Sequence, residues 1–223
     1  MTIKLLVQAI TKILLGIILV GLLIFLPAGT FSFVNGWLLM GILFLPMIVT
    51  GFIMMFKNPE LLKKRLYARE KQHEQRLVVF LSACMFCIGF AVAGLTVRFN
   101  WFTLPQSVVI VATVVFLVSY VIYAEVLREN AYLSRTIEIQ VNQKVIDKGL
   151  YGIVRHPMYS VTLFLFLSMP LILGSIYAFL IFMAYPFIIV KRIKSEEEFL
   201  ERELKGYSEY KKKVKYRLIP LIW

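Results

Sequence analysis

Apolar residues are gathered in long blocks along this chain, and most polar residues fall between the blocks. A helix needs about 20 apolar residues to cross the hydrocarbon core of a membrane, which is about 30 Å thick. Four blocks have this length, at residues 5–26, 37–56, 77–97 and 105–124. Charged residues, proline or asparagine close each of them. The pattern therefore predicts four membrane-spanning helices.

The last apolar region, residues 159–190, is too long for one upright span. Gly174 and Ser175 interrupt it near the middle. A hairpin of two short helices fits this pattern, because irregular backbone is tolerated at membrane depth only where protein covers it. We therefore expect an all-α integral membrane protein with about six membrane helices, the last two forming a short helical hairpin.

The polar tail that follows predicts one more helix. Residues 195–198 read Ser-Glu-Glu-Glu, which has the form of an S-x-x-E capping box with an acidic first turn. Phe199, Leu200 and Leu204 follow at helical spacing. We expect a four-helix transmembrane region at 1–124, and a second region at 125–223 with the hairpin and a cytosolic tail helix.

Composition agrees with lipid as the solvent. Hydrophobic residues make up 60% of the 223 residues, above the roughly 45–50% of soluble domains. The first block starts with positive charge, as a signal peptide does, but its apolar run exceeds the 7–15 residues of a signal core and Lys12 interrupts its start. We expect it to be retained as a span. Cys84 and Cys87 lie inside an apolar block, so neither a disulfide framework nor a metal site is predicted.

The distribution of basic residues predicts the orientation in the membrane. The net charge is +12, but the basic residues lie between apolar blocks rather than along one face, which indicates anionic lipid headgroups rather than nucleic acid. Residues 57–76 carry seven lysines and arginines, whereas 28–35 and 100–104 carry none. The positive-inside rule then places both termini and residues 57–76 in the cytoplasm, and we expect a prokaryotic inner membrane. The polar regions 125–158 and 191–223 fall on that same side.

Residues 149–159, GLYGIVRHPMY, place several polar side chains directly before the apolar hairpin. Tyr151, Arg155, His156 and Tyr159 are crowded at a predicted membrane edge, which indicates a functional site. The alternative is an interfacial aromatic belt with a snorkelling arginine, which explains the tyrosines and Arg155 but not the His-Pro pair. The residues by themselves leave both interpretations open.

This segment, followed by RIKSEEEFLERELKGYSEYKKKVKYRLIP, resembles the isoprenylcysteine carboxyl methyltransferase family and its bacterial relatives. The resemblance rests on G-x-Y-x-x-x-R-H-P-x-Y, a later R-x-x-x-E-E, and Y-x-x-Y ending in R-x-I-P, in the family's order and spacing. It covers residues 140–223, while the four earlier spans add only general hydropathy. It implies an S-adenosylmethionine-dependent methyltransferase.

The resemblance also implies roles for single residues. Arg192 and Glu196 are the implied catalytic residues, and Arg192 falls where the family contacts its substrate. Their spacing also permits an ordinary i,i+4 surface pair. The implied cofactor contacts are Gln140, Gln143, Lys144, Val145, Ile146, Tyr151, His156, Pro157, Met158, Tyr159 and Glu196. Carboxylate and aromatic groups of these types suit a positively charged sulfonium cofactor.

The acceptor is less constrained than the reaction. We expect a membrane-associated lipid or lipidated molecule, with the carboxylate of an isoprenylated cysteine as the favoured class. A carboxylate is already ionised at pH 7 and needs no base. A phospholipid amine is the alternative, and Glu196, Glu197 or Tyr151 would then remove the proton. A membrane sterol-type reductase using a nicotinamide cofactor and a non-catalytic membrane protein are further alternatives. The oligomeric state is not predicted.

Overall fold

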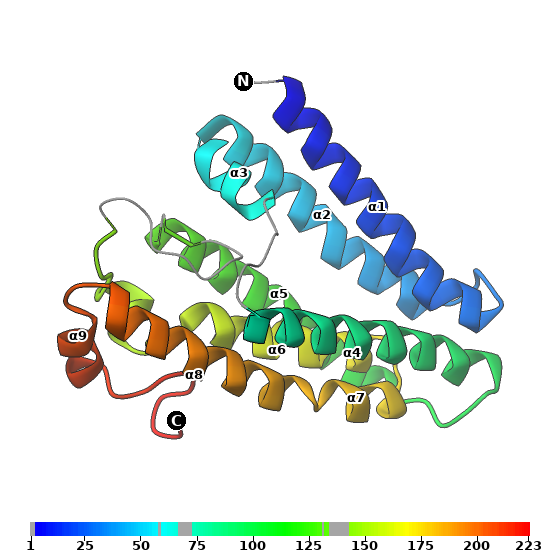
Figure 1. Cartoon of the computed structure of the whole chain (residues 1–223). Helices are drawn as coiled ribbons and strands as arrows, with labels where there is room; N and C mark the ends of the chain where they lie inside the picture. Colours follow the sequence, from blue (N-terminus) through cyan, green and yellow to red (C-terminus); the bar gives the residue numbers. More distant parts are fainter. Residues whose placement is uncertain (1–2, 58, 67–72, 131, 134–142) are drawn as a thin grey trace.

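The computed structural model describes residues 3–57, 59–66, 73–130, 132–133 and 143–223. Over these residues the chain is all-helical, which confirms the predicted fold class (Figure 1). Four long helices coincide with the four predicted spans: α1 (Ile3–Ala28), α2 (Val34–Lys57), α4 (His73–Arg98) and α5 (Gln106–Glu129). A short helix, α3 (Pro59–Leu66), lies within the basic segment. The orientation of the chain in the membrane stays a prediction.

The predicted hairpin is present in the described part of the chain. Its first arm is α6 (Pro157–Ile172), and its second arm is α7 (Ile176–Phe182) followed by α8 (Tyr185–Glu203). The stretch Ile176–Glu203 is a fifth segment long and apolar enough to cross a membrane, whereas α6 is shorter. Gly174 has φ +74°, a backbone conformation that favours glycine, and it lies in the turn. The Ser175 side chain then caps α7 by accepting the Ala178 N–H at 3.1 Å.

The predicted start of the tail helix was wrong. Helix α8 begins at Tyr185 and continues without interruption through Ser195 to Glu203, so the Ser-Glu-Glu-Glu stretch lies inside it. A capping side chain is useful only where backbone N–H groups lack helical acceptors. The preceding residues are already helical, because Ile189 and Ile193 on this helix bury their side chains in the main hydrophobic core. A separate short helix does follow, α9 (Tyr207–Lys213).

Close packing joins the helices into one body. In Figure 1, α1 and α2 run side by side, and α4 lies along the second arm of the hairpin. A Cβ atom on Gly94 of α4 would stand 2.4 Å from the backbone oxygen of Ile24 in α1, so only glycine permits this approach. Phe116 and Phe182 are fully buried in the same core. Many large apolar side chains on the outer faces remain exposed, as expected where the solvent is lipid.

The two polar regions meet beyond one end of the hairpin. Arg155 N–H donates to the Tyr216 carbonyl and His156 N–H donates to the Arg217 carbonyl, both at 2.9 Å. On the other side, the Glu129 carboxylate at the end of α5 accepts the Leu150 N–H at 2.9 Å and holds the short 3-10 helix η1 (Gly149–Gly152). These contacts bring the GLYGIVRHPMY segment against α8, α9 and the C-terminal tail.

Candidate active site

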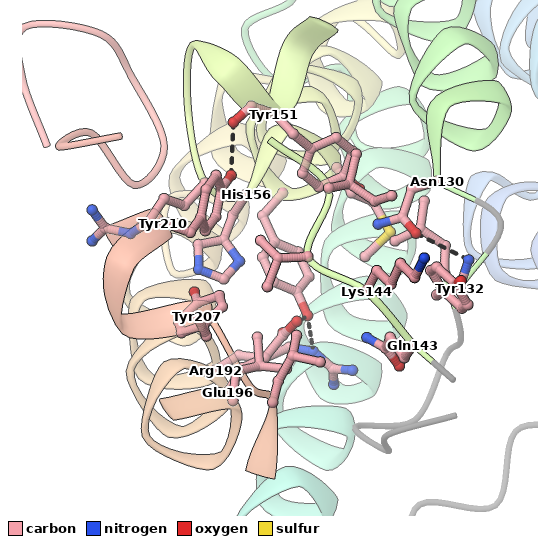
Figure 2. Close-up of a pocket in the computed structure, with 18 residues that line it drawn as sticks. Asn130, Tyr132, Gln143, Lys144, Tyr151, His156, Arg192, Glu196, Tyr207 and Tyr210 are labelled. Carbon is pink, nitrogen blue, oxygen red and sulfur yellow. Dashed lines mark hydrogen bonds between the residues drawn. The ribbon is translucent and has the colours of Figure 1, made fainter. Parts of the chain in front are cut away.

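A cavity lined by both polar and apolar side chains lies where these segments meet (Figure 2). It contains most of the site residues that the resemblance implies. Those that line it are Gln143, Lys144, Val145, Ile146, Tyr151, His156, Met158, Tyr159, Arg192 and Glu196. Pro157 does not line the cavity but is buried as the first residue of α6. Gln140 lies outside the described residues.

Local geometry explains how the motif presents its side chains. Pro157 begins α6, a position where its missing N–H has no helical acceptor to lose. His156 therefore stands just before the helix, and Tyr159 lies on its first turn. Both side chains are buried, with 5% exposure each, and their rings stack with centroids 5.7 Å apart. Residues 143–146, in a non-helical segment, form the opposite wall, and Figure 2 shows Gln143 and Lys144 across the cavity from His156.

Tyr159 links the two implied catalytic residues. Its hydroxyl donates to Glu196 Oε2 at 2.5 Å and accepts from Arg192 Nε at 2.8 Å. The Arg192 guanidinium carbon also lies 5.8 Å from the centre of the Tyr159 ring, within the range of a cation–π contact. Arg192 and Glu196 are one helical turn apart on α8 and both line the cavity. The surface pair considered above does not describe this arrangement, because both side chains engage a buried tyrosine.

Glu197 forms the most buried charge cluster near the cavity, and the sequence did not reveal this role. One carboxylate oxygen accepts from Arg155 Nε at 2.6 Å and lies 3.2 Å from His156 Nε2. The other oxygen accepts from Arg217 Nε at 2.8 Å. Only 2% of Glu197 is exposed. The carboxylate therefore fixes His156 at the cavity wall and ties the C-terminal tail to α8.

Other cavity residues were also missed. Arg155, which the crowding of polar residues had already indicated, lines the cavity, whereas seven further lining residues were not predicted: Asn130, Tyr132 and Leu133, which follow α5, and Leu200, Leu204, Tyr207 and Tyr210. The Y-x-x-Y spacing was a usable signal for the last two. Tyr210 donates its hydroxyl to the Tyr151 carbonyl at 2.7 Å, which holds η1 against α9.

Burial keeps the cavity tyrosines outside the spans neutral. The pKa values of Tyr151, Tyr207 and Tyr210 are all raised well above the ordinary value, chiefly because burial disfavours the charged phenolate. Nearby carboxylates raise the pKa of Tyr207 further, with Glu197 contributing more than Glu196. At neutral pH these hydroxyls therefore keep their protons and remain hydrogen-bond donors.

The donor set suits an organic cation better than a metal. Within the ranges the structure describes, no group of three or more His, Cys, Asp or Glu side chains is placed to hold a metal ion. The cavity instead combines the Glu196 carboxylate, the aromatic faces of Tyr151 and Tyr159, and the cations of Lys144 and Arg192. A molecule with a sulfonium, an amino-acid head and ribose hydroxyls would find partners for each of these groups.

Comparison with known proteins supports a methyltransferase. Residues 107–206 match the family model of phospholipid methyltransferases. That family lies in the same superfamily as the isoprenylcysteine carboxyl methyltransferases, so the resemblance is supported at the level of the superfamily. No curated protein matches the chain. The matched segment runs from α5 through the hairpin to the end of α8 and includes the cavity residues up to Leu204. Together with the long apolar helices, it suggests a membrane methyltransferase.

Proposed function

We propose that the chain transfers the methyl group of S-adenosylmethionine to a membrane-associated acceptor, with a carboxylate such as that of an isoprenylated cysteine as the favoured class. One observation carries the proposal. Tyr159 is hydrogen-bonded to both Arg192 and Glu196. All three line the same cavity as most of the implied cofactor contacts in the segment 143–159. The residues implied to bind the cofactor and the residue implied to bind the substrate therefore line the same cavity.

The cofactor would be held between the segment 143–146 and the α8 face of the cavity. S-adenosylmethionine supplies an electrophilic methyl group on a positively charged sulfur. Glu196 and the Tyr151 and Tyr159 rings would stabilise that positive charge. Glu197 holds His156 in place at 3.2 Å, so that the imidazole remains fixed at the wall. Gln143 and Lys144 face the cavity from the other side, where they would bind polar parts of the cofactor.

Arg192 is the residue best suited to orient the acceptor. Its Nε is bonded to Tyr159, while a guanidinium has five N–H donors in a planar fork that matches a carboxylate. Methyl transfer is an in-line displacement, so the main task of the protein is positioning and exclusion of water. Good orientation of two reactants supplies about 7–11 kcal/mol. An ionised carboxylate attacks directly and requires no base.

The comparison favours a second candidate acceptor, a phospholipid amine, because the matching family model is that of phospholipid methyltransferases. An amine is protonated at neutral pH and must lose a proton before it attacks. Glu196 is the carboxylate placed in the cavity for that task, and Tyr159 already donates a hydrogen bond to it. The same cavity and cofactor would serve both reactions.

The experiment that tests the proposal is transfer of label from methyl-tritiated S-adenosylmethionine to a membrane lipid extract by the detergent-purified protein. We expect lipid-soluble label that depends on the protein. Alkali then separates the two acceptors, because a methyl ester releases its label as volatile methanol whereas an N-methyl group retains it. Absence of any transfer to extracts that contain both acceptor classes, with a nicotinamide cofactor bound instead, would favour the reductase alternative.

A further inference from the structure

Tyr207 stands out among the residues that line the cavity. It is the first residue of α9 and is only 3% exposed. In the part of the chain that the structure describes, its hydroxyl is the one buried side-chain nitrogen or oxygen atom that lacks a hydrogen-bond partner. Figure 2 shows Tyr207 on the same side of the cavity as His156 and Tyr210.

An unpartnered buried hydroxyl requires an explanation. Buried polar side-chain atoms are nearly always hydrogen-bonded, since leaving one unpaired sacrifices its contact with water. The surrounding groups follow this rule. Tyr210, one turn along α9, donates to the Tyr151 carbonyl at 2.7 Å, and Tyr159 has two partners across the cavity. The exception, the Tyr207 hydroxyl, therefore belongs to a residue that lines the cavity.

The chemistry of the site defines what would satisfy Tyr207. Burial and the neighbouring carboxylates Glu197 and Glu196 keep its phenol protonated, so it offers one donor as well as acceptor lone pairs. The Glu197 carboxylate already accepts hydrogen bonds from Arg155 and Arg217 and lies within hydrogen-bond distance of His156. The Tyr207 hydroxyl bonds to none of these groups, so we look for its partner outside them. S-adenosylmethionine brings a carboxylate, ribose hydroxyls and adenine nitrogens, each of which can accept a hydrogen bond.

We propose that Tyr207 is a further cofactor-binding residue, whose hydroxyl gains its hydrogen bond when S-adenosylmethionine enters the cavity. This inference rests on the proposed function. It adds a residue that neither the resemblance nor the matched segment, which ends at residue 206, assigns to the cofactor. The unpaired hydroxyl slightly destabilises the ligand-free protein. Cofactor binding would supply the hydrogen bond that this hydroxyl lacks in the folded protein.

The test measures both binding and stability. S-adenosylhomocysteine, the unreactive product of the cofactor, is titrated into the detergent-purified protein by calorimetry, and the melting temperature is measured without ligand. Tyr207→Phe should leave the ligand-free melting temperature unchanged or raised, because it removes an unpaired polar atom. Its affinity should fall about 3- to 10-fold, the loss of one net hydrogen bond.

Tyr210→Phe is the matched control for the sign of the stability change. The two tyrosines are on the same short helix, but the Tyr210 hydroxyl has a protein partner, so its removal should lower the ligand-free melting temperature. Equal affinities of wild type and Tyr207→Phe would overturn the inference and indicate a bound water at this hydroxyl. A lowered melting temperature in Tyr207→Phe would also overturn it, because the hydroxyl would then have a structural partner. Failure of the proposed function is distinct, because wild type itself would not bind S-adenosylhomocysteine.

Discussion

Removal of the Glu197 charge should destabilise the protein strongly. The Glu197 side chain is 3% exposed and the Arg155 side chain 4%, so Glu197→Gln leaves a buried guanidinium without its counter-charge. Breaking a buried ion pair from one side destabilises by about 3–5 kcal/mol. Two features place the expected loss near the lower end, at about 3 kcal/mol. Arg155 keeps its bonds to the Val214 and Lys215 carbonyls, and Arg217 is 28% exposed and can regain water.

Glu201→Gln provides a matched control for this prediction. Glu201 lies one helical turn further along α8 and pairs with Lys211 at 2.9 Å, but both side chains are about one-third exposed. An exposed pair of this kind contributes about 0–1 kcal/mol, so the control should unfold almost as wild type does. The assay is reversible unfolding in mixed micelles, followed by tryptophan fluorescence. Equal losses in the two variants would refute the reasoning that burial of Glu197, rather than its charge alone, stabilises this region.

Three further predictions concern the site and the topology. His156→Ala and Tyr159→Ala should each weaken cofactor affinity by about 1–3 kcal/mol in calorimetry while the protein still folds, and unchanged affinity in both would remove them from the cofactor wall. Glu196→Gln should lower cofactor affinity, whereas Arg192→Ala should abolish methyl transfer with cofactor binding nearly kept. Arg192→Lys should recover little transfer, because lysine lacks the planar fork, and near wild-type transfer by Arg192→Ala would return this residue to a structural role. Cysteines introduced between residues 57 and 76 should resist impermeant labelling in intact cells, and strong labelling would contradict the cytoplasmic orientation.

The long helices could be predicted because membrane thickness dictates their length. The blocks at 5–26, 37–56, 77–97 and 105–124 lie within observed helices except for Pro105, which directly precedes α5, and most helix ends extend by a few residues into polar sequence. The hairpin was predicted from the length of the apolar region 159–190 and from its interruption by Gly174 and Ser175. The break between α7 and α8 was not predicted, because Met183 and Ala184 carry no turn signal. The prediction that a helix begins at Ser195 was wrong because burial of the preceding residues outweighed the local capping pattern, so the helix already begins at Tyr185.

The motifs of the site could be predicted from the sequence, but which side chains contact one another could not. The motifs contain Arg192, Glu196, Glu197 and His156. The sequence does not show which glutamate faces the cavity, because adjacent residues on a helix point about 100° apart. Glu196 faces the cavity and Glu197 faces the C-terminal tail. Which of the two faces the cavity depends on how α8 packs in the folded protein. The residues after α5 could not be found either, because they reach the cavity through a long-range contact. Gln140 remains a prediction outside the described residues.

Equilibrium binding of S-adenosylmethionine to the detergent-purified protein tests whether this cavity is a methyltransferase cofactor site. Titration with tritiated cofactor should give saturable binding of one molecule per chain, displaced by S-adenosylhomocysteine and not by a nicotinamide cofactor. The same titration of Glu196→Gln should show weaker binding, since this carboxylate lines the cavity and is bonded to Tyr159. A folded wild-type protein that shows no saturable binding, or that binds only the nicotinamide cofactor, would contradict the assignment.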